Sequence, residues 1–255
     1  MVLIMAFIDQ EILPQSYSLW CCIMSCIFQY YSLAEAAKAQ GVVVVIDVLR
    51  AFTTVAFAFH AGVKRILPVS GIEEAFLLKQ RFPKVLIMGE DHGLQVPGFD
   101  FGNSPADIAR AEIVGKTLIQ RTTAGTQGII RAENASKLIA ASFVCADATA
   151  NYLQSTRANV ISFIITGTSY GRDGDEDLAC AEYITALVRQ EHIEPDAYLA
   201  RVGSSSAGHV FLDEHQLFMH PDDLRLCLQV NEFKFYMPII KDGDLLVMQQ
   251  EFGVI

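Results

Sequence analysis

The stretch GVVVVIDVLRAFTT, residues 41–54, decides how the fold of this 255-residue chain is interpreted. Residues 42–46 are five consecutive β-branched residues. Such a run is typical of a strand that is covered on both faces, as in a mainly parallel sheet. The residues that follow, up to Gly62, are predicted to form a helix that ends at this glycine. A buried strand followed at once by a helix indicates an α/β fold.

The same alternation of strand and helix patterns continues along the rest of the chain. Further strands are predicted at residues 65–69, 84–89, 117–123, 137–144, 160–167 and 233–240, and helices at 72–82, 105–112, 125–135, 148–155, 178–191 and 222–229. Elements that alternate in this way predict a three-layer α/β/α fold. No low-complexity linker interrupts them, so any two lobes must pack tightly.

Composition and charge narrow the class of protein. The chain is 52% hydrophobic and 19% charged, which excludes a disordered chain and fits a globular enzyme. Its net charge of −10 and the absence of a Lys/Arg run argue against a nucleic-acid partner. The apolar segment 19–31 is too short to span a bilayer, so no membrane partner is expected.

Residues 1–30 are interpreted as an N-terminal extension of uncertain structure.

The cysteines suggest a cytoplasmic protein. The six cysteines form no CxxC pair and no regular framework, which is typical of reduced thiols in the cytoplasm. They are Cys21, Cys22, Cys26, Cys145, Cys180 and Cys227.

In open α/β sheets, ligands bind beyond the carboxyl ends of the strands, and four polar loops here follow predicted strands. The first contains Asp47 and Arg50. A carboxylate there can ligate Mg²⁺ or attack phosphorus, and an arginine can bind phosphate through two hydrogen bonds. The alternative is a helix-capping aspartate paired with its neighbour. A haloacid-dehalogenase phosphatase is disfavoured, because Leu49 stands where its second aspartate is needed.

The second loop, GEDHGLQVPGFDFGNSP at residues 89–105, is too rich in glycine and polar residues to be explained by folding alone. Glu90 follows a predicted strand directly, which is the expected position of a metal ligand. Asn103 is a candidate for substrate binding. His92 is expected to be a surface residue without a role in catalysis.

The third loop lies in GKTLIQRTTAGTQG, residues 115–128. It is not a P-loop, because Arg110 stands where that motif needs its first glycine. The turn TTAGTQG either offers helix-terminal amides to an anion or is an ordinary strand-to-helix turn. The candidates for binding substrate are Lys116, Arg121, Thr122, Thr123, Gly125 and Thr126.

The fourth loop, GTSYGRDGDEDLAC at residues 167–180, precedes a predicted helix. It contains four carboxylates: Asp173, Asp175, Glu176 and Asp177. The loop is not an EF-hand, because Leu178 stands where glycine is required. Asp173 and Asp175 could serve only as partners of the helix dipole. Glu176 and Asp177 are the stronger candidates for metal ligands.

These motifs together resemble the 2-phosphosulfolactate phosphatase family. The matching segments, in family order, are VVVIDVLRAFTT (43–54), MGEDHGLQVPGFDFGNSP (88–105), GKTLIQRTTAGTQG (115–128) and EDLACAEYI (176–184). The resemblance implies an α/β/α phosphatase domain over residues 31–255, with two similar halves at about 31–145 and 146–255 that face a shared cleft. It also implies Mg²⁺-dependent removal of phosphate from 2-phosphosulfolactate, a step towards coenzyme M.

The expected roles follow from this resemblance. Asp47, Glu90, Glu176 and Asp177 would hold Mg²⁺ against the phosphate of a small anionic substrate. Asp47 and Arg50 would be catalytic, and the attacking group is either a metal-bound water or Asp47 itself. A homo-oligomer is left open.

One residue departs from the family pattern. Many relatives carry asparagine where this chain has Ala124. Two alternatives therefore stay open: a phosphatase for another 2-phospho-hydroxyacid, and a non-catalytic anion-binding relative.

Overall fold

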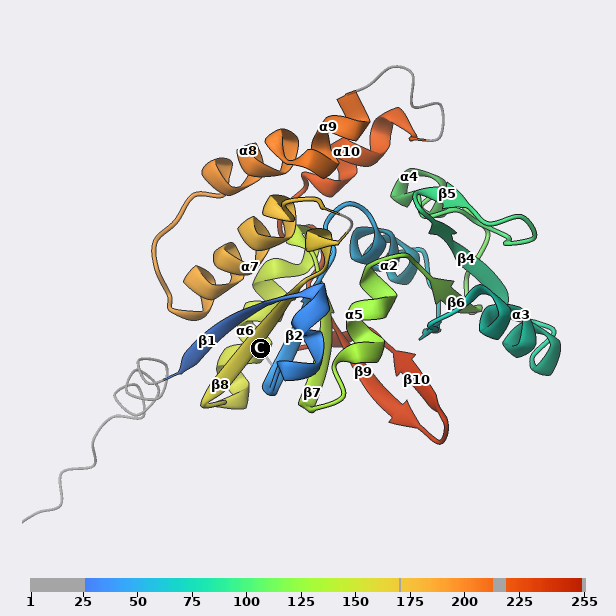
Figure 1. Cartoon of the computed structure of the whole chain (residues 1–255), viewed down its shortest axis with the longest axis horizontal. Helices are drawn as coiled ribbons and strands as arrows, with labels where there is room; N and C mark the ends of the chain where they lie inside the picture. Colours follow the sequence, from blue (N-terminus) through green and yellow to red (C-terminus); the bar gives the residue numbers. More distant parts are fainter. Residues whose placement is uncertain (1–25, 170, 213–218, 254–255) are drawn as a thin grey trace, which may run out of the picture.

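The computed structural model of the protein describes residues 26–169, 171–212 and 219–253 (Figure 1). In this part of the chain the strands form one continuous hydrogen-bonded path, in the order β1-β8-β2-β7-β9-β10-β3-β6-β4-β5. Most pairs in it are parallel, and helices lie on both sides of the sheet. The predicted α/β fold is confirmed.

The sheet contains two groups of parallel strands joined by an antiparallel hairpin. The first group is β1 (Ile27–Ser32), β8 (Val160–Ile165), β2 (Gly41–Ile46) and β7 (Ala135–Ala141). The second group is β3 (Arg65–Pro68), β6 (Thr117–Arg121) and β4 (Leu86–Asp91). The hairpin that joins them is β9 (Phe235–Asp242) and β10 (Leu245–Met248), which pair with β7 and β3 respectively. Two short strands complete the sheet: β5 (Leu94–Gln95) beside β4, and β11 (Glu251–Phe252) beside β9.

Helices connect most of these strands. The α-helices are α2 (Ala51–His60), α3 (Ile72–Arg81), α4 (Pro105–Ile108), α5 (Gly125–Arg131), α6 (Ala146–Thr156), α7 (Asp175–Val188), α8 (Asp196–Ser204), α9 (Ser206–Leu212) and α10 (Pro221–Cys227). The 3-10 helices are η1 (Leu33–Lys38), η2 (Phe143–Cys145) and η3 (Thr166–Thr168). In Figure 1, α8, α9 and α10 (orange) lie at the top of the molecule, and the β9–β10 hairpin (red) extends from the opposite side.

The two groups of strands do not follow the order of the chain. β8 lies between β1 and β2, and the β3–β6–β4 group is inserted in sequence between β2 and β7. The expected division near residue 145 therefore falls inside the first group of strands and does not separate two lobes. The expected extension is also shorter than 30 residues, because residues 27–30 belong to β1 and pair with β8. Residues 1–25 lie outside the described part of the chain.

The core explains why the decisive stretch forms a strand. Val43, Val44, Val45 and Ile46 are fully buried, and β2 is paired on both edges. The β3–β6–β4 group alternates between two cores, as the pleat of a strand requires. Ile66, Met88 and Leu118 face the main core, whereas Leu67, Ile87 and Ile119 face a smaller core under α3. Both groups of strands thus share one main core. No helix among the described residues has the length and apolar character needed to cross a bilayer.

Candidate active site

A cavity of about 240 Å³ lies beyond the carboxyl ends of β2, β4, β6 and β8. This is the position expected for the site of an open α/β sheet. The predicted site residues that line it are Asp47, Arg50, Glu90, Asn103, Thr123, Glu176 and Asp177. They come from all four of the polar loops, so the structure brings together residues that are up to 130 positions apart in sequence.

Asp47 follows β2 directly and is almost fully buried. Its Oδ1 accepts a hydrogen bond from the backbone N–H of Ala51 in the first turn of α2, at 3.0 Å. Burial raises the pKa of Asp47 from 3.8 to about 6. The hydrogen bond from Ala51 and the charge of Arg172 oppose this shift, whereas Glu90 and Glu176 add to it. Asp47 can therefore bind or release a proton close to neutral pH.

Glu90, at the end of β4, holds two loops together. Its Oε1 accepts from the N–H of Thr123 at 2.6 Å, and its Oε2 accepts from Thr123 Oγ1 at 2.9 Å and from the N–H of Gly93 at 2.5 Å. Both carboxylate oxygens thus already accept hydrogen bonds from the protein. Glu90 fixes the loop after β6 against the loop after β4.

Asp177, in the first turn of α7, ties together the ends of β2 and β8. Its Oδ1 accepts from the N–H of Val48 at 2.8 Å, and its Oδ2 accepts from the N–H of Gly167 at 2.7 Å and from Thr166 Oγ1 at 3.2 Å. Burial raises the pKa of Asp177 well above its usual value, and the charges of Glu176 and Asp47 raise it further.

Glu176 differs from Glu90 and Asp177, because one of its carboxylate oxygens lacks a partner. Glu176 is 2% exposed, and its Oε2 is buried without a hydrogen bond. Burial raises the pKa of this carboxyl group. An unpaired buried oxygen is costly, so this atom is suited to accept a ligand. A Cβ on Gly167 would lie 2.3 Å from Glu176 Oε1, which explains why glycine stands beside it.

The carboxylates do not form a ready-made metal cage. Within the described ranges, no three His, Cys, Asp or Glu side chains are placed to hold one ion together. The oxygens best placed to serve a ligand are those of Asp47 and Glu176, since both oxygens of Glu90 and Asp177 already accept hydrogen bonds from the protein.

Arg50 is held by a buried ion pair. Its Nη1 lies 2.8 Å from Oδ2 of Asp223 in α10, and both side chains are nearly inaccessible to solvent. Asp223 Oδ1 also accepts from Ser104 Oγ at 2.6 Å and from the N–H of Ala106 at 3.2 Å. The guanidinium carbon of Arg50 lies 5.6 Å from the centre of the Phe211 ring. Asp223 therefore joins α10 and the start of α4 to the arginine at the cavity.

The turn at residues 122–128 is closed by its own threonines. The N–H of Thr122 donates to Thr126 Oγ1 and the N–H of Thr126 donates to Thr122 Oγ1, each at 3.0 Å. The amides of Thr122, Thr123 and Thr126 are therefore already engaged within the protein. From this turn only Thr123 and Ala124 line the cavity. The other predicted residues of the turn, Thr122, Gly125 and Thr126, are buried and do not line the cavity.

Replacing Gly125 with alanine is expected to disturb the cavity. The new Cβ would lie 2.7 Å from Asp47 Oδ2 and 2.9 Å from the Cβ of Ala51. Either Asp47 or the start of α2 must move, which we expect to lower the free energy of unfolding by about 1–3 kcal/mol and to impair any activity that uses Asp47. Urea unfolding measures the first effect. Gly203→Ala in α8 is the matched control, because its Cβ would meet nothing within 4 Å. A stability equal to that of the control would contradict the prediction.

Two predicted substrate-binding cations do not reach the cavity. Lys116 precedes β6 and is exposed, so it lies at the amino end of the strand, whereas the cavity lies at the carboxyl end. Arg121 donates from Nη1 to the carbonyl of Glu90 and to Asp91 Oδ1, both at 2.7 Å. Its charge is thus used to join β4 and β6. The structure therefore does not bring Lys116 and Arg121 to the cavity.

The structure adds residues that the sequence patterns did not identify. Arg172 lines the cavity next to the acidic cluster, and α9 contributes Ala207, Val210 and Phe211 to its wall. His92 is exposed, as predicted, yet it also lines the cavity, and its backbone N–H donates to Thr123 Oγ1. The one available signal for Arg172 was its place inside the fourth polar loop.

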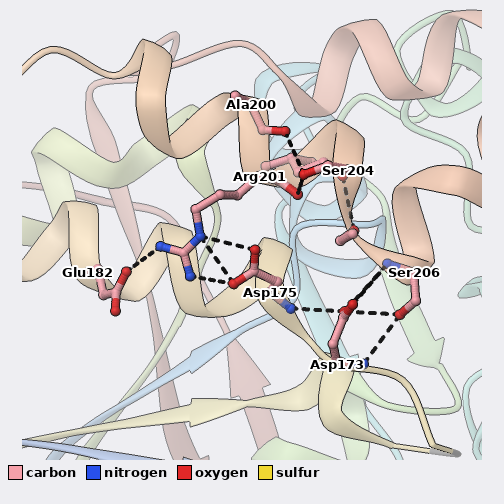
Figure 2. Close-up of polar contacts among 9 residues, drawn as sticks. Asp173, Asp175, Glu182, Ala200, Arg201, Ser204 and Ser206 are labelled. Atoms are coloured by element: carbon pink, nitrogen blue, oxygen red, sulfur yellow. Dashed lines mark hydrogen bonds and ion pairs between the residues drawn. The ribbon is translucent and has the colours of Figure 1, made fainter.

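Two contacts fasten the start of α7 to α8 and α9 (Figure 2). Asp173 accepts a hydrogen bond from Ser206 Oγ at 2.9 Å and donates its own N–H to that oxygen at 3.3 Å. Arg201 binds Asp175 through two nitrogens and also contacts Glu182. The two aspartates that were considered as simple dipole partners thus connect the fourth loop to neighbouring helices.

Comparisons with known proteins identify the family of this chain. The family described as 2-phosphosulpholactate phosphatase matches residues 28–242. A "Probable 2-phosphosulfolactate phosphatase" of Bacillus subtilis is 34% identical over 224 residues, which cover 87% of this chain and 95% of that protein. A protein of the same name from Carboxydothermus hydrogenoformans is 45% identical over 149 residues, 58% of this chain and 61% of that one. The chain therefore belongs to the 2-phosphosulpholactate phosphatase family, a family of phosphoric monoester hydrolases.

Proposed function

We propose that this protein is a Mg²⁺-dependent phosphatase that hydrolyses 2-phosphosulfolactate to sulfolactate and phosphate. The observation that carries the proposal is the cavity beyond the strand ends, which is lined by Asp47 and by Glu176 with its buried, unpaired oxygen. The family membership and the names of the relatives support the reaction type.

Mg²⁺ fits the donor set of this cavity. The ion prefers oxygen ligands and is usually bound through one or two carboxylates together with waters and substrate phosphates. Asp47 and Glu176 offer two such carboxylates, and the raised pKa of each reflects burial without a sufficient compensating cation. We therefore assign direct ligation to Asp47 and Glu176, and expect Glu90 and Asp177 to act mainly by fixing the loops around them.

The chain's own residues would then divide the remaining work. Bound Mg²⁺ would neutralise phosphate charge and favour in-line displacement. Arg50, held in place by Asp223, would bind the phosphate oxygens. Thr123 and Asn103 line the same cavity. Asp47 either attacks phosphorus or accepts the proton of an attacking water, and a pKa of about 6 suits the second role.

Phosphate release from a panel of substrates tests the proposal. The panel contains 2-phosphosulfolactate and other phosphorylated 2-hydroxyacids, each measured with Mg²⁺ and with EDTA. We expect release from 2-phosphosulfolactate that requires Mg²⁺. Release that is faster from a substrate without sulfonate would favour the second candidate, a phosphatase for another 2-phospho-hydroxyacid. That candidate rests on Ala124, which lines the cavity and stands where the family resemblance implies asparagine. No release from any substrate would leave an anion-binding relative.

Mg²⁺ is expected to stabilise the protein more at about pH 7.5 than at about pH 5, because a metal ligand must be deprotonated to bind. The pKa of Asp47 is raised from 3.8 to about 6, so the carboxyl is mainly protonated at the lower pH. The folded state then binds more protons than the unfolded state between these values. The free energy of unfolding of the metal-free protein therefore falls as the pH rises through this range. Melting temperatures with Mg²⁺ and with EDTA at both pH values measure the effect, and an equal metal-induced rise at both would contradict it.

The setting of the reaction is part of the same proposal. Among the described residues the cysteines Cys26, Cys145, Cys180 and Cys227 are free thiols, and all but Cys26 are buried. Free thiols are typical of a reducing compartment, which supports a cytoplasmic location. The product would serve coenzyme M formation if 2-phosphosulfolactate is the substrate.

A further inference from the structure

The cavity has few cations to offer an anionic ligand. Among the described residues that line it, the arginines are Arg50 and Arg172, and no lysine is present. Arg50 is already paired with the buried Asp223. Among the described residues, Arg172 hydrogen-bonds to Ser169, with Nε 3.4 Å from its carbonyl oxygen and Nη2 3.1 Å from its Oγ. Its charge also acts through space on Asp47 and Glu176. Within the described part of the chain, Arg172 is thus the cavity arginine that pairs with no carboxylate.

The charge around the cavity makes this arginine important. Four carboxylates line the cavity, those of Asp47, Glu90, Glu176 and Asp177. One Mg²⁺ ion carries two positive charges. It therefore cannot offset the negative charges of the carboxylates and of the substrate's phosphate together. A substrate with another anionic group beside its phosphate would meet net repulsion unless a second cation received that group. A guanidinium is suited to this task, because its planar fork donates two parallel hydrogen bonds to an oxyanion.

The position of Arg172 is set by its neighbours in the fourth loop. Asp173, the next residue, is bonded to Ser206 at the start of α9 (Figure 2). The same helix places Val210 and Phe211 in the cavity wall. On the other side of Asp173, Gly174 adopts a positive φ of 67°, and a Cβ there would lie 2.7 Å from the N–H nitrogen of Thr168. The loop that contains Arg172 is therefore tightly turned and is hydrogen-bonded to α9, which lines the cavity.

We propose that Arg172 binds the second anionic group of the substrate, a carboxylate or sulfonate next to the phosphate-bearing carbon, and that the Asp173–Ser206 contact positions it. This inference rests on the proposed function, since it concerns the substrate of the same cavity. Arg172 is a specificity-determining residue in this account, and Asp173 and Ser206 are positioning residues.

Equilibrium binding of sulfolactate in the presence of Mg²⁺ tests the role of Arg172. Calorimetry compares the wild type, Arg172→Gln and Arg172→Lys, with inorganic phosphate as a second probe. We expect Arg172→Gln to weaken sulfolactate binding about tenfold to a hundredfold, with a smaller loss in Arg172→Lys and an unchanged affinity for phosphate. Arg65→Gln is the matched control, because Arg65 starts β3 away from the cavity and is exposed. An unchanged sulfolactate affinity, an equal loss for phosphate, or no binding to the wild type would overturn the proposal.

Two further probes identify the group that Arg172 receives. Lactate carries only the carboxylate of sulfolactate, and 2-hydroxyethanesulfonate carries only the sulfonate. If Arg172→Gln weakens the binding of one and leaves the other unchanged, that group is the ligand of Arg172. If neither affinity changes while that for sulfolactate also stays constant, the assignment is wrong.

Ser206→Ala tests the positioning contact. We expect KM for 2-phosphosulfolactate and the dissociation constant of sulfolactate to rise about threefold to tenfold, with kcat unchanged and with rescue by Ser206→Thr. Ser204→Ala is the matched control, because the hydrogen bonds of Ser204 Oγ among the described residues go to carbonyls of its own helix, those of Ala200 and Arg201 (Figure 2). A parallel fall in kcat, or an equal effect in the control, would overturn the positioning role.

These binding measurements separate the two proposals. Sulfolactate contains no phosphate, so its binding does not depend on turnover. If Arg172→Gln weakens sulfolactate binding but the chain releases no phosphate from any substrate, the proposed function fails and the anion-binding role of Arg172 stands. If phosphate is released and the Arg172→Gln variant binds sulfolactate as the wild type does, the proposed function stands and the role of Arg172 fails.

Discussion

Asp47→Asn is expected to lower phosphate release by at least about a thousandfold, the scale seen when a central catalytic group is removed. Asparagine keeps the shape of the side chain and an oxygen for the N–H of Ala51, but it can neither carry the charge that binds a metal ion nor accept a proton. Asp47 follows β2, an inner strand of the first group, and borders the cavity that the other predicted carboxylates line.

The same substitution is expected to leave the fold intact. Because burial raises the pKa of Asp47 to about 6, its charge at about pH 7.5 costs folding free energy, and a neutral amide removes that cost. The melting temperature of the metal-free variant should therefore be no lower than that of the wild type. Asp242→Asn, at the exposed end of β9, is the control for loss of one charge. Turnover close to that of the wild type would remove Asp47 from the mechanism.

Asp223→Ala is expected to lower the free energy of unfolding by about 3–5 kcal/mol, because it leaves a buried arginine without its counter-charge. Asp223 is fully buried and receives hydrogen bonds from Arg50, Ser104 and the N–H of Ala106. Its loss frees three donors at once and loosens α10 from α4. Activity should fall as well, since Arg50 would no longer be held at the cavity.

The neighbouring residue supplies a matched control for this stability change. Asp222, on the same turn of α10, is partly exposed and contacts the exposed Arg110 and Arg225. Surface pairs of this kind contribute at most about 1 kcal/mol, so Asp222→Ala should change the unfolding transition little. Chemical denaturation of both variants gives the comparison. If the two substitutions cost the same, the buried pair is not the stabilising contact that its geometry indicates.

The predicted elements that were confirmed are those with strong local patterns. The buried strands β2, β4 and β8 and the helices α2 and α7 all appear within a few residues of their expected ranges. Helices α8 and α9 were not predicted, because each is short, with nine and seven residues. The position of β8 between β1 and β2 was not predicted, because this pairing depends on contacts between distant segments. No local pattern records such a contact.

In the site, too, residues marked by their sequence neighbours were predicted, whereas contacts between distant segments were not. Asp47 and Glu90 were identifiable because a charge at the end of an apolar strand needs a partner. Lys116 directly precedes the predicted strand 117–123, so its place at the amino end of β6 could have been predicted from the sequence. Asp223 reaches Arg50 from 173 positions away, and only the folded chain brings them together. Arg172 belongs to no recognisable sequence motif. Its proposed role could be inferred only once the structure showed that it lines the cavity together with the carboxylates.

The β9–β10 hairpin has a consequence for how the molecule is made. It is the only link in the described sheet between the first and second groups of parallel strands, and it comes after both of them in the chain. During translation, the facing edges of β7 and β3 therefore emerge from the ribosome long before the residues that will pair with them. Unpaired strand edges favour association between chains. The nascent protein thus passes through a period in which it is vulnerable to aggregation, and the completion of this hairpin ends that period.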